Sequence, residues 1–118
     1  MPYLYQFLQY IIYFTAFDQG EPFHVHVISC DYYRQGDTSH SEKIWLGKFG
    51  QAQLASSGKN IKKSDLKDIL TFLKTNELIY KEAVDKWCEM FQITPEQIDY
   101  FRNFSNGGGG AGLGGGGR

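Results

Sequence analysis

Hydrophobic and polar positions follow two different periods along the chain, and the period changes near residue 64. Before that point, short runs rich in aromatic and β-branched residues predict strands, because such side chains pack well on a pleated surface. We expect strands at about 3–8, 10–17, 23–30, 42–47 and 51–55. The polar segment 34–41 is expected to be a loop.

From Ser64 onward, apolar residues recur at helical spacing. Leu66, Ile69, Leu70 and Leu73 form the apolar stripe of a first helix, for which Ser64 is the expected N-cap. A second helix is expected from about Glu77 to Phe91, with an apolar stripe of its own.

Strands followed by helices predict the α+β class, with a small antiparallel sheet of about four or five strands and two or three helices packed on one face. Thr94, Pro95 and Gln97 have the sequence of a capping box and predict the third, short helix at about 95–103. One domain is expected over residues 1–106. The glycine-rich tail at 107–118 should be a flexible coil, since it has nothing to bury.

Composition narrows the function classes without choosing one. Aromatic residues make up 16% of the chain and the wider hydrophobic set 42%, which is enough for a compact core. The net charge of −1 excludes a strongly basic nucleic-acid-binding protein but allows a local basic patch. Cys30 and Cys88 are far apart, which favours a reduced, cytoplasmic protein. Gln6 and Gln9 interrupt the apolar N-terminus, so we interpret it as buried strand and expect no membrane association.

The segment Glu-Pro-Phe-His-Val-His-Val, residues 21–27, carries the most informative chemistry. Alternation along a strand places His24 and His26 on the face opposite the apolar residues, with their Cα atoms about 6.5 Å apart. Two imidazoles at this spacing can bind a divalent metal ion, or can act as general acid and base on a scissile phosphate. The plainer alternative is a structural role on a solvated sheet face, which we favour for a His-x-His pair by itself.

A metal site on this strand would need a third ligand, and no recognisable spacing identifies it. The nearest candidates in sequence are Asp18, Glu21, Asp31, His40 and Glu42. Because metal motifs require a complete ligand set, a divalent metal stays one alternative among several.

In the strand expected at 42–47, alternation turns Lys43 and Trp45 away from the core. If this strand pairs antiparallel with the histidine strand, all four side chains share one surface. The tryptophan could then stack a base or an aromatic ligand while the lysine holds a phosphate. Lys43 is therefore a candidate catalytic residue, and Trp45 and Glu42 are candidate binding residues. Alternatively, Trp45 packs under the aromatic N-terminal strands.

A local basic cluster marks the entrance to the first helix. Its members are Lys59, Lys62, Lys63 and Lys67. Lys62 and Lys63 are candidate binding residues for a phosphate backbone or an acidic partner. The alternative, which we favour, is a solvated helix start.

The order of these features resembles a bacterial family of small domains of unknown function. The family signature reads Pro-Pro-His-Ile-His-Val, followed by an Ala-Lys-x-Trp-Leu-like strand and a helix that closes on Trp-x-x-x-Phe. The matching segments here are 22–27, 43–46 and 87–91, with Phe23 in the place of the usual second proline. The resemblance covers about residues 3–91.

Members of this family are often described as components of toxin–antitoxin-type gene pairs, next to a small partner with a DNA-binding look. The resemblance therefore implies a cytoplasmic bacterial protein that acts on RNA or on a small cognate protein through the face bearing the two histidines, Lys43 and Trp45. As an enzyme it would be a ribonuclease-like hydrolase or transferase. The alternatives are a non-catalytic protein-interaction module and a metal-binding domain that uses His24 and His26.

Overall fold

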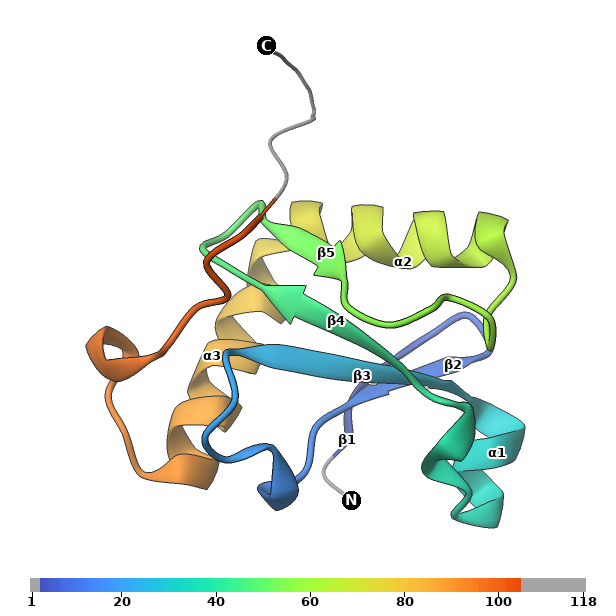
Figure 1. The fold of residues 1–118 in the computed structure, drawn as a ribbon, viewed down its shortest axis with the longest axis horizontal. Coiled ribbons are helices and arrows are strands. Elements are labelled where there is room, and N and C mark those ends of the chain that lie inside the picture. The colour runs from blue at the N-terminus through green and yellow to red at the C-terminus, as the bar shows by residue number, and fades with distance from the viewer. Residues whose placement is uncertain (1–2, 105–118) are drawn as a thin grey trace, which may run out of the picture.

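The computed structural model describes residues 3–104 and has the α+β fold that the sequence predicts. Its centre is a five-stranded antiparallel sheet in the order β1-β2-β3-β4-β5, so each strand pairs with the next one along the chain (Figure 1). The strands are β1 (Tyr3–Phe7), β2 (Tyr10–Tyr13), β3 (His24–Ser29), β4 (Glu42–Leu46) and β5 (Ala52–Leu54). The glycine-rich tail expected at 107–118 lies outside the described residues.

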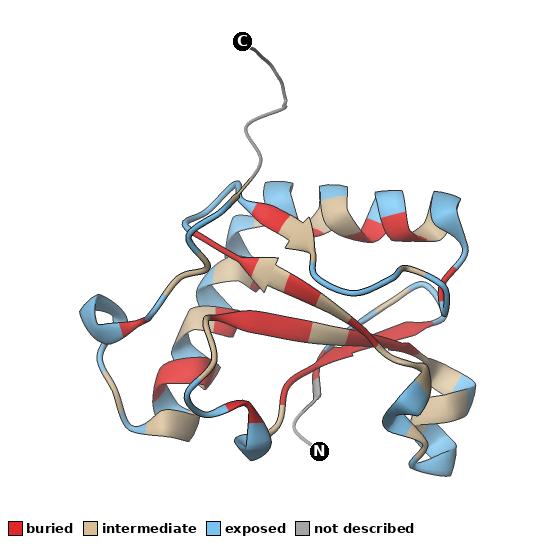
Figure 2. Cartoon of the chain, viewed as in Figure 1, coloured by how far each residue is buried: buried red, intermediate tan, exposed pale blue. Residues whose placement is uncertain are grey.

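Two long helices, α2 (Lys63–Thr75) and α3 (Glu77–Phe91), pack on one face of the sheet (Figure 1). Their apolar stripes meet the apolar side chains of the strands, so the buried residues of the helices face the buried residues of the sheet (Figure 2). Val25 and Val27 of β3 lie at the centre of this core and are fully buried. This burial is the main source of stability, because the removal of apolar surface from water drives folding.

Several element ends differ from the sequence prediction because local caps decide them. The expected second strand stops at Tyr13, since Thr15 caps a 3₁₀ turn, η1 (Ala16–Asp18). The polar loop contains a second 3₁₀ turn, η2 (Thr38–His40). A short helix before it, α1 (Cys30–Gln35), was not predicted.

The two C-terminal helix predictions need correction at their ends. Lys62, and not Ser64, is the N-cap residue of α2, without a side-chain hydrogen bond. The third helix is a single 3₁₀ turn, η3 (Pro95–Gln97), closed by the predicted capping box. After η3 the chain runs on without a helix, because Ile98 has an extended backbone.

The residues after η3 return to the sheet. Ile98 is buried in the main core, and the carbonyl oxygen of Asp99 accepts a hydrogen bond of 2.8 Å from the backbone nitrogen of Phe23. Phe101 stacks on Trp45 with a centroid distance of 4.8 Å and an interplanar angle of 5°. We call residues 98–104 the C-terminal arm. No helix within residues 3–104 is both long and apolar enough to span a membrane.

Candidate metal centre

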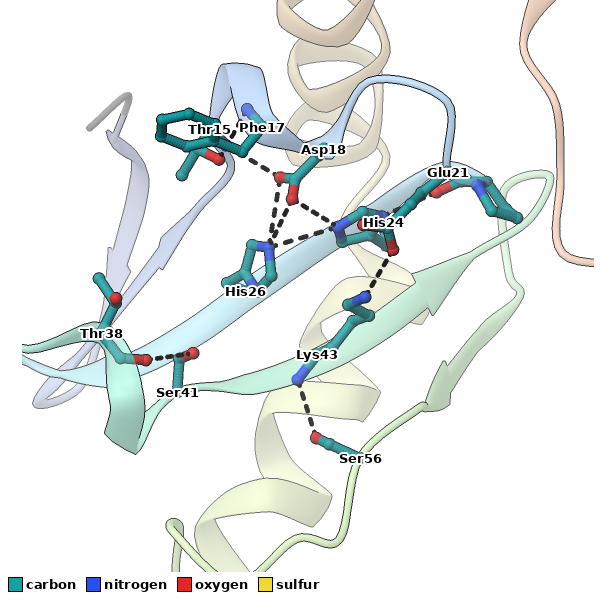
Figure 3. A network of polar contacts seen from close by, with 11 residues as sticks. Thr15, Phe17, Asp18, Glu21, His24, His26, Thr38, Ser41, Lys43 and Ser56 are labelled. Carbon is teal, nitrogen blue, oxygen red and sulfur yellow. Dashed lines mark hydrogen bonds and ion pairs between the residues drawn. The ribbon is translucent and has the colours of Figure 1, made fainter.

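Strand β3 presents His24 and His26 on the face away from the core, as alternation predicts. In the antiparallel pairing of β3 with β4, His24 lies opposite Trp45 and His26 lies opposite Lys43. The four side chains therefore share one face of the sheet, and Figure 3 shows His24, His26 and Lys43 side by side on it.

Asp18 reaches the same face from η1, the 3₁₀ turn between β2 and β3. Thr15 begins this turn: its Oγ1 accepts a hydrogen bond of 3.2 Å from the backbone nitrogen of Phe17. In return, the backbone nitrogen of Thr15 donates to Asp18 Oδ2 at 2.9 Å. This capping box fixes the carboxylate over the two imidazoles (Figure 3). The Thr-x-x-Asp spacing is the sequence signal that could have singled out Asp18 among the candidate third ligands.

Three donor atoms converge at this point. The Nε2 atoms of His24 and His26 are 3.3 Å apart. Asp18 Oδ1 lies 3.2 Å from Nε2 of His24 and 3.0 Å from Nε2 of His26. Together the three side chains form a group that could hold a metal ion, and we call it the Asp18–His24–His26 centre.

The orientation of His24 is fixed by the backbone. Its Nδ1 lies 2.7 Å from the carbonyl oxygen of Pro22, and a carbonyl can only accept, so Nδ1 carries the proton. Nε2 is therefore the ring nitrogen that is directed toward Asp18 and His26. His24 has an exposed fraction of 0%, so bulk water does not reach its ring.

Asp18 is only 5% exposed, and its surroundings still favour the ionised form. Burial by itself raises the pKa of Asp18, but the hydrogen bonds with His24 and His26 and from the backbone of Thr15 outweigh it. The pKa of Asp18 consequently lies well below its usual range. An ionised carboxylate is the form that a metal ligand requires.

A pocket of about 530 Å³ opens beside the centre. Its lining includes Asp18 and His26 of the centre, the aromatic residues Tyr13 and Phe17, and the hydroxyl side chains of Thr38 and Ser41. The ring of Tyr13 stacks on His26 with a centroid distance of 5.1 Å. His24 is not part of this lining, so the centre meets the pocket through its other two members. The sequence did not single out the pocket, because its residues come from separate segments.

Lys43 and Trp45 lie beside the centre without joining it. Lys43 Nζ donates to Glu21 Oε1 at 2.6 Å and lies 5.3 Å from the centroid of the Trp45 ring. Trp45 is stacked under Phe101 of the C-terminal arm instead of under the N-terminal strands. A ligand that stacked on this face of Trp45 would have to displace Phe101.

The other candidate third ligands have partners elsewhere. Asp31 Oδ1 accepts from Arg34 at 2.6 Å, and His40 Nε2 lies 3.5 Å from Asp37 Oδ2. Glu42 is fully buried opposite Val27, on the core side of β4.

The candidate binding residues Glu42, Lys62 and Lys63 are not brought to the centre. Glu42 accepts hydrogen bonds from Ser56 and from the backbone nitrogens of Gly58 and Asn60. Lys62 and Lys63 lie exposed at the start of α2. Their placement fits the solvated helix start that the sequence analysis favours.

Comparison of the chain with protein-family models, with curated proteins and with solved structures gives no match. The resemblance to a toxin–antitoxin-associated family therefore stays a prediction from the sequence.

Proposed function

We propose that this chain is a divalent-metal-binding domain with hydrolytic activity, in which Asp18, His24 and His26 hold one transition-metal ion. The observation that supports this proposal is the convergence of three donor atoms at distances of 3.0 to 3.3 Å from one another. The ion would take three protein ligands, and its remaining positions would face the pocket.

The donor spacing agrees with the bond lengths of a first-row metal. With metal–ligand bonds of about 2.0–2.1 Å, neighbouring donors lie about 2.8–3.0 Å apart in an octahedral site and about 3.3–3.4 Å apart in a tetrahedral one, and the observed spacing falls between these values. Two histidines and one carboxylate with further positions open are also the ligand set of catalytic zinc sites and of non-haem iron sites. The hydrogen bond from His24 Nδ1 to a backbone carbonyl is the usual outer-shell support for a ligating imidazole.

Charge also favours an ion at this point. Metal ligation requires both imidazoles to be neutral and the carboxylate to be ionised. In this state the three side chains carry a net charge of −1, and a bound divalent ion changes it to +1. The positive centre would then attract an anionic oxygen donor from the pocket.

An ion with an open position lowers the pKa of bound water and polarises a phosphoryl or carbonyl oxygen, which is hydrolytic chemistry. Metal-free acid–base catalysis by His24 and His26 is less well supported. His24 is completely buried, and both imidazoles face the same carboxylate instead of lying on either side of a phosphate. RNA as the substrate and a toxin–antitoxin context stay predictions.

The test of metal binding is titration of the purified chain with Zn²⁺, Mn²⁺ and Fe²⁺ by calorimetry, with metal content measured after dialysis. We expect one equivalent of at least one ion, and a loss of affinity of 100-fold or more in Asp18→Asn. The matched control is Asp37→Asn, which removes the carboxylate of a partly exposed Asp–His pair outside the centre. Folded protein that retains no ion, or equal affinity in Asp18→Asn, would contradict metal binding.

Hydrolysis is tested separately with bis(4-nitrophenyl) phosphate and with single-stranded RNA. We expect turnover only in the metal-loaded protein, with loss in Asp18→Asn and on addition of EDTA. If the chain binds one ion and cleaves neither substrate, metal binding stands and the hydrolytic part of the proposal is wrong. Growth arrest on expression that depends on Asp18 would support the toxin–antitoxin prediction.

A further inference from the structure

We propose that the pocket beside the centre recognises an aromatic ring joined to an anionic oxygen head group, and that Phe17 is the residue that selects the ring. This inference rests on the proposed metal site: the head group binds the ion, and the ring lies in the pocket. The proposed function names no ligand for the pocket, and this inference adds one.

The direction of the ligand follows from the burial of the three donors. His24 is fully buried, whereas the His26 side chain is 16% exposed and lines the pocket together with Asp18. The open positions of a bound ion therefore face the pocket. A head group on the ion places the rest of its molecule against the pocket wall.

The pocket wall is suited to an uncharged ring. Apart from Asp18 and His26, the described residues that line it are neutral: two aromatic residues, one alanine and three with hydroxyl groups. The ion would therefore be the positive charge that attracts the head group. The aromatic residues can stack on a ring, and the hydroxyl groups of Thr15, Thr38 and Ser41 can bond to polar atoms at its edge.

Phe17 is the residue placed to make this selection. It is 93% exposed, the largest exposed fraction among the large hydrophobic residues described, and it lines the pocket directly before Asp18. The capping box of η1 fixes its backbone, because its nitrogen donates to Thr15. Figure 3 shows Phe17 on η1 next to Asp18. An exposed ring on a rigid turn beside an ion site gives a stacking surface at little cost in ordering.

The test uses two probes with the same metal-binding head, acetohydroxamate and benzohydroxamate, on the metal-loaded full chain. We expect benzohydroxamate to bind at least tenfold tighter by calorimetry, because only it carries a ring. In Phe17→Ala, the ratio of the two affinities should fall below threefold, while metal affinity and acetohydroxamate affinity stay unchanged. This variant should fold normally, since the Phe17 side chain is almost wholly in solvent.

Phe49→Ala is the matched control, because Phe49 is an exposed aromatic residue that does not line the pocket. It should keep the wild-type ratio. Equal affinity of the metal-loaded wild type for the two probes, or an unchanged ratio in Phe17→Ala, would overturn this inference alone. A chain that retains no ion before any probe is added would overturn the metal site as well.

A second pair of comparisons identifies the source of the ring. Preference for uridine 5′-monophosphate over ribose 5-phosphate, lost in Phe17→Ala, would support the inference with a nucleotide as ligand. Preference for benzoate over acetate without any nucleotide preference would support it with an aromatic acid. No preference in either pair would overturn it.

Discussion

Two buried carboxylates near the β3–β4 pair have opposite surroundings, and the difference separates a structural residue from the residue that we propose as a metal ligand. Glu42 is surrounded by neutral donors, namely the Ser56 hydroxyl and the backbone nitrogens of Gly58 and Asn60. Asp18 faces two imidazoles and an open pocket. Glu42 therefore fixes the loop after β5, whereas Asp18 is available for a ligand.

Replacement of Glu42 with glutamine should lower the free energy of unfolding by about 2 kcal/mol. The NH₂ group of the glutamine amide would face N–H groups that donate to the carboxylate, and two donors cannot bond to each other. Urea denaturation at pH 7 measures this loss. Exposed Glu82→Gln is the control, which we expect to change stability by less than about 0.5 kcal/mol. Equal stability of Glu42→Gln and wild type would contradict the structural role of Glu42.

The same substitution tests a pH dependence. Burial raises the pKa of Glu42, but the hydrogen bonds from Ser56, Asn60 and Gly58 outweigh it, so the pKa is lowered overall. A lowered pKa in the folded state stabilises the fold above the ordinary glutamate pKa of about 4.3, and this stability is lost as pH falls through the folded value. Glu42→Gln should therefore lose less stability than wild type between pH 5 and pH 3.

At the level of elements, the sequence predicts what depends on local pattern. The alternation in β3 and β4 predicts that His24, His26, Lys43 and Trp45 share a face, and the β3–β4 register confirms it. The apolar stripes predict both α2 and α3, and the buried residues of α2 lie on its stripe. In α3 the stripe expected at 80, 84, 87 and 91 is only partly right, because the buried residues are Ile79, Ala83, Trp87 and Cys88. Helix α1 was missed because none of its residues is buried, so it has no apolar stripe to detect.

The rest of the site depends on tertiary structure. Asp18 meets the histidines only because η1 folds back over β3. The position of η1 depends in turn on the pairing of strands that are far apart in the sequence. For the same reason the stacking of Phe101 on Trp45 could not be predicted, since the two residues belong to the C-terminal arm and to β4. Spacing in the sequence therefore identified two of the three donors and left five candidates for the third.

The turn between β1 and β2 contains none of the residue types that usually mark a hairpin turn in a sequence. Leu8 occupies it with a φ of 56°, in the left-handed region that glycine adopts without strain. Leu8→Gly should raise the free energy of unfolding by about 0.5–1 kcal/mol, after allowance for the added freedom of the unfolded chain. Leu8→Ala is the control, because alanine keeps the Cβ atom and should give no gain. Urea denaturation of both variants is the measurement, and a gain with alanine alone would show this explanation to be wrong.

At the scale of the whole molecule, the C-terminal arm joins the two faces of the sheet. Ile98 enters the core, while Phe101 covers Trp45 on the face that carries the Asp18–His24–His26 centre. The arm also bonds to the backbone just before β3 through the pair Phe23–Asp99. The folded unit thus extends beyond α3, into a segment outside the part of the chain that resembles the bacterial family.

Truncation distinguishes this arm from the sequence that follows it. Removal of residues 107–118 should leave the free energy of unfolding unchanged, because that glycine-rich sequence has nothing to bury. Removal of residues 95–118 should lower it by about 2–4 kcal/mol, through the loss of buried Ile98 and of the ring stacked on Trp45.

The shorter chain should also show red-shifted tryptophan fluorescence, since Trp45 becomes exposed to water. Phe101→Ala should reproduce that shift without the full loss of stability, whereas Arg102→Ala, an exposed neighbour in the arm, should change neither. If the chain that ends at Thr94 is as stable as the full chain, the arm is an accessory and Trp45 is free to bind a ligand.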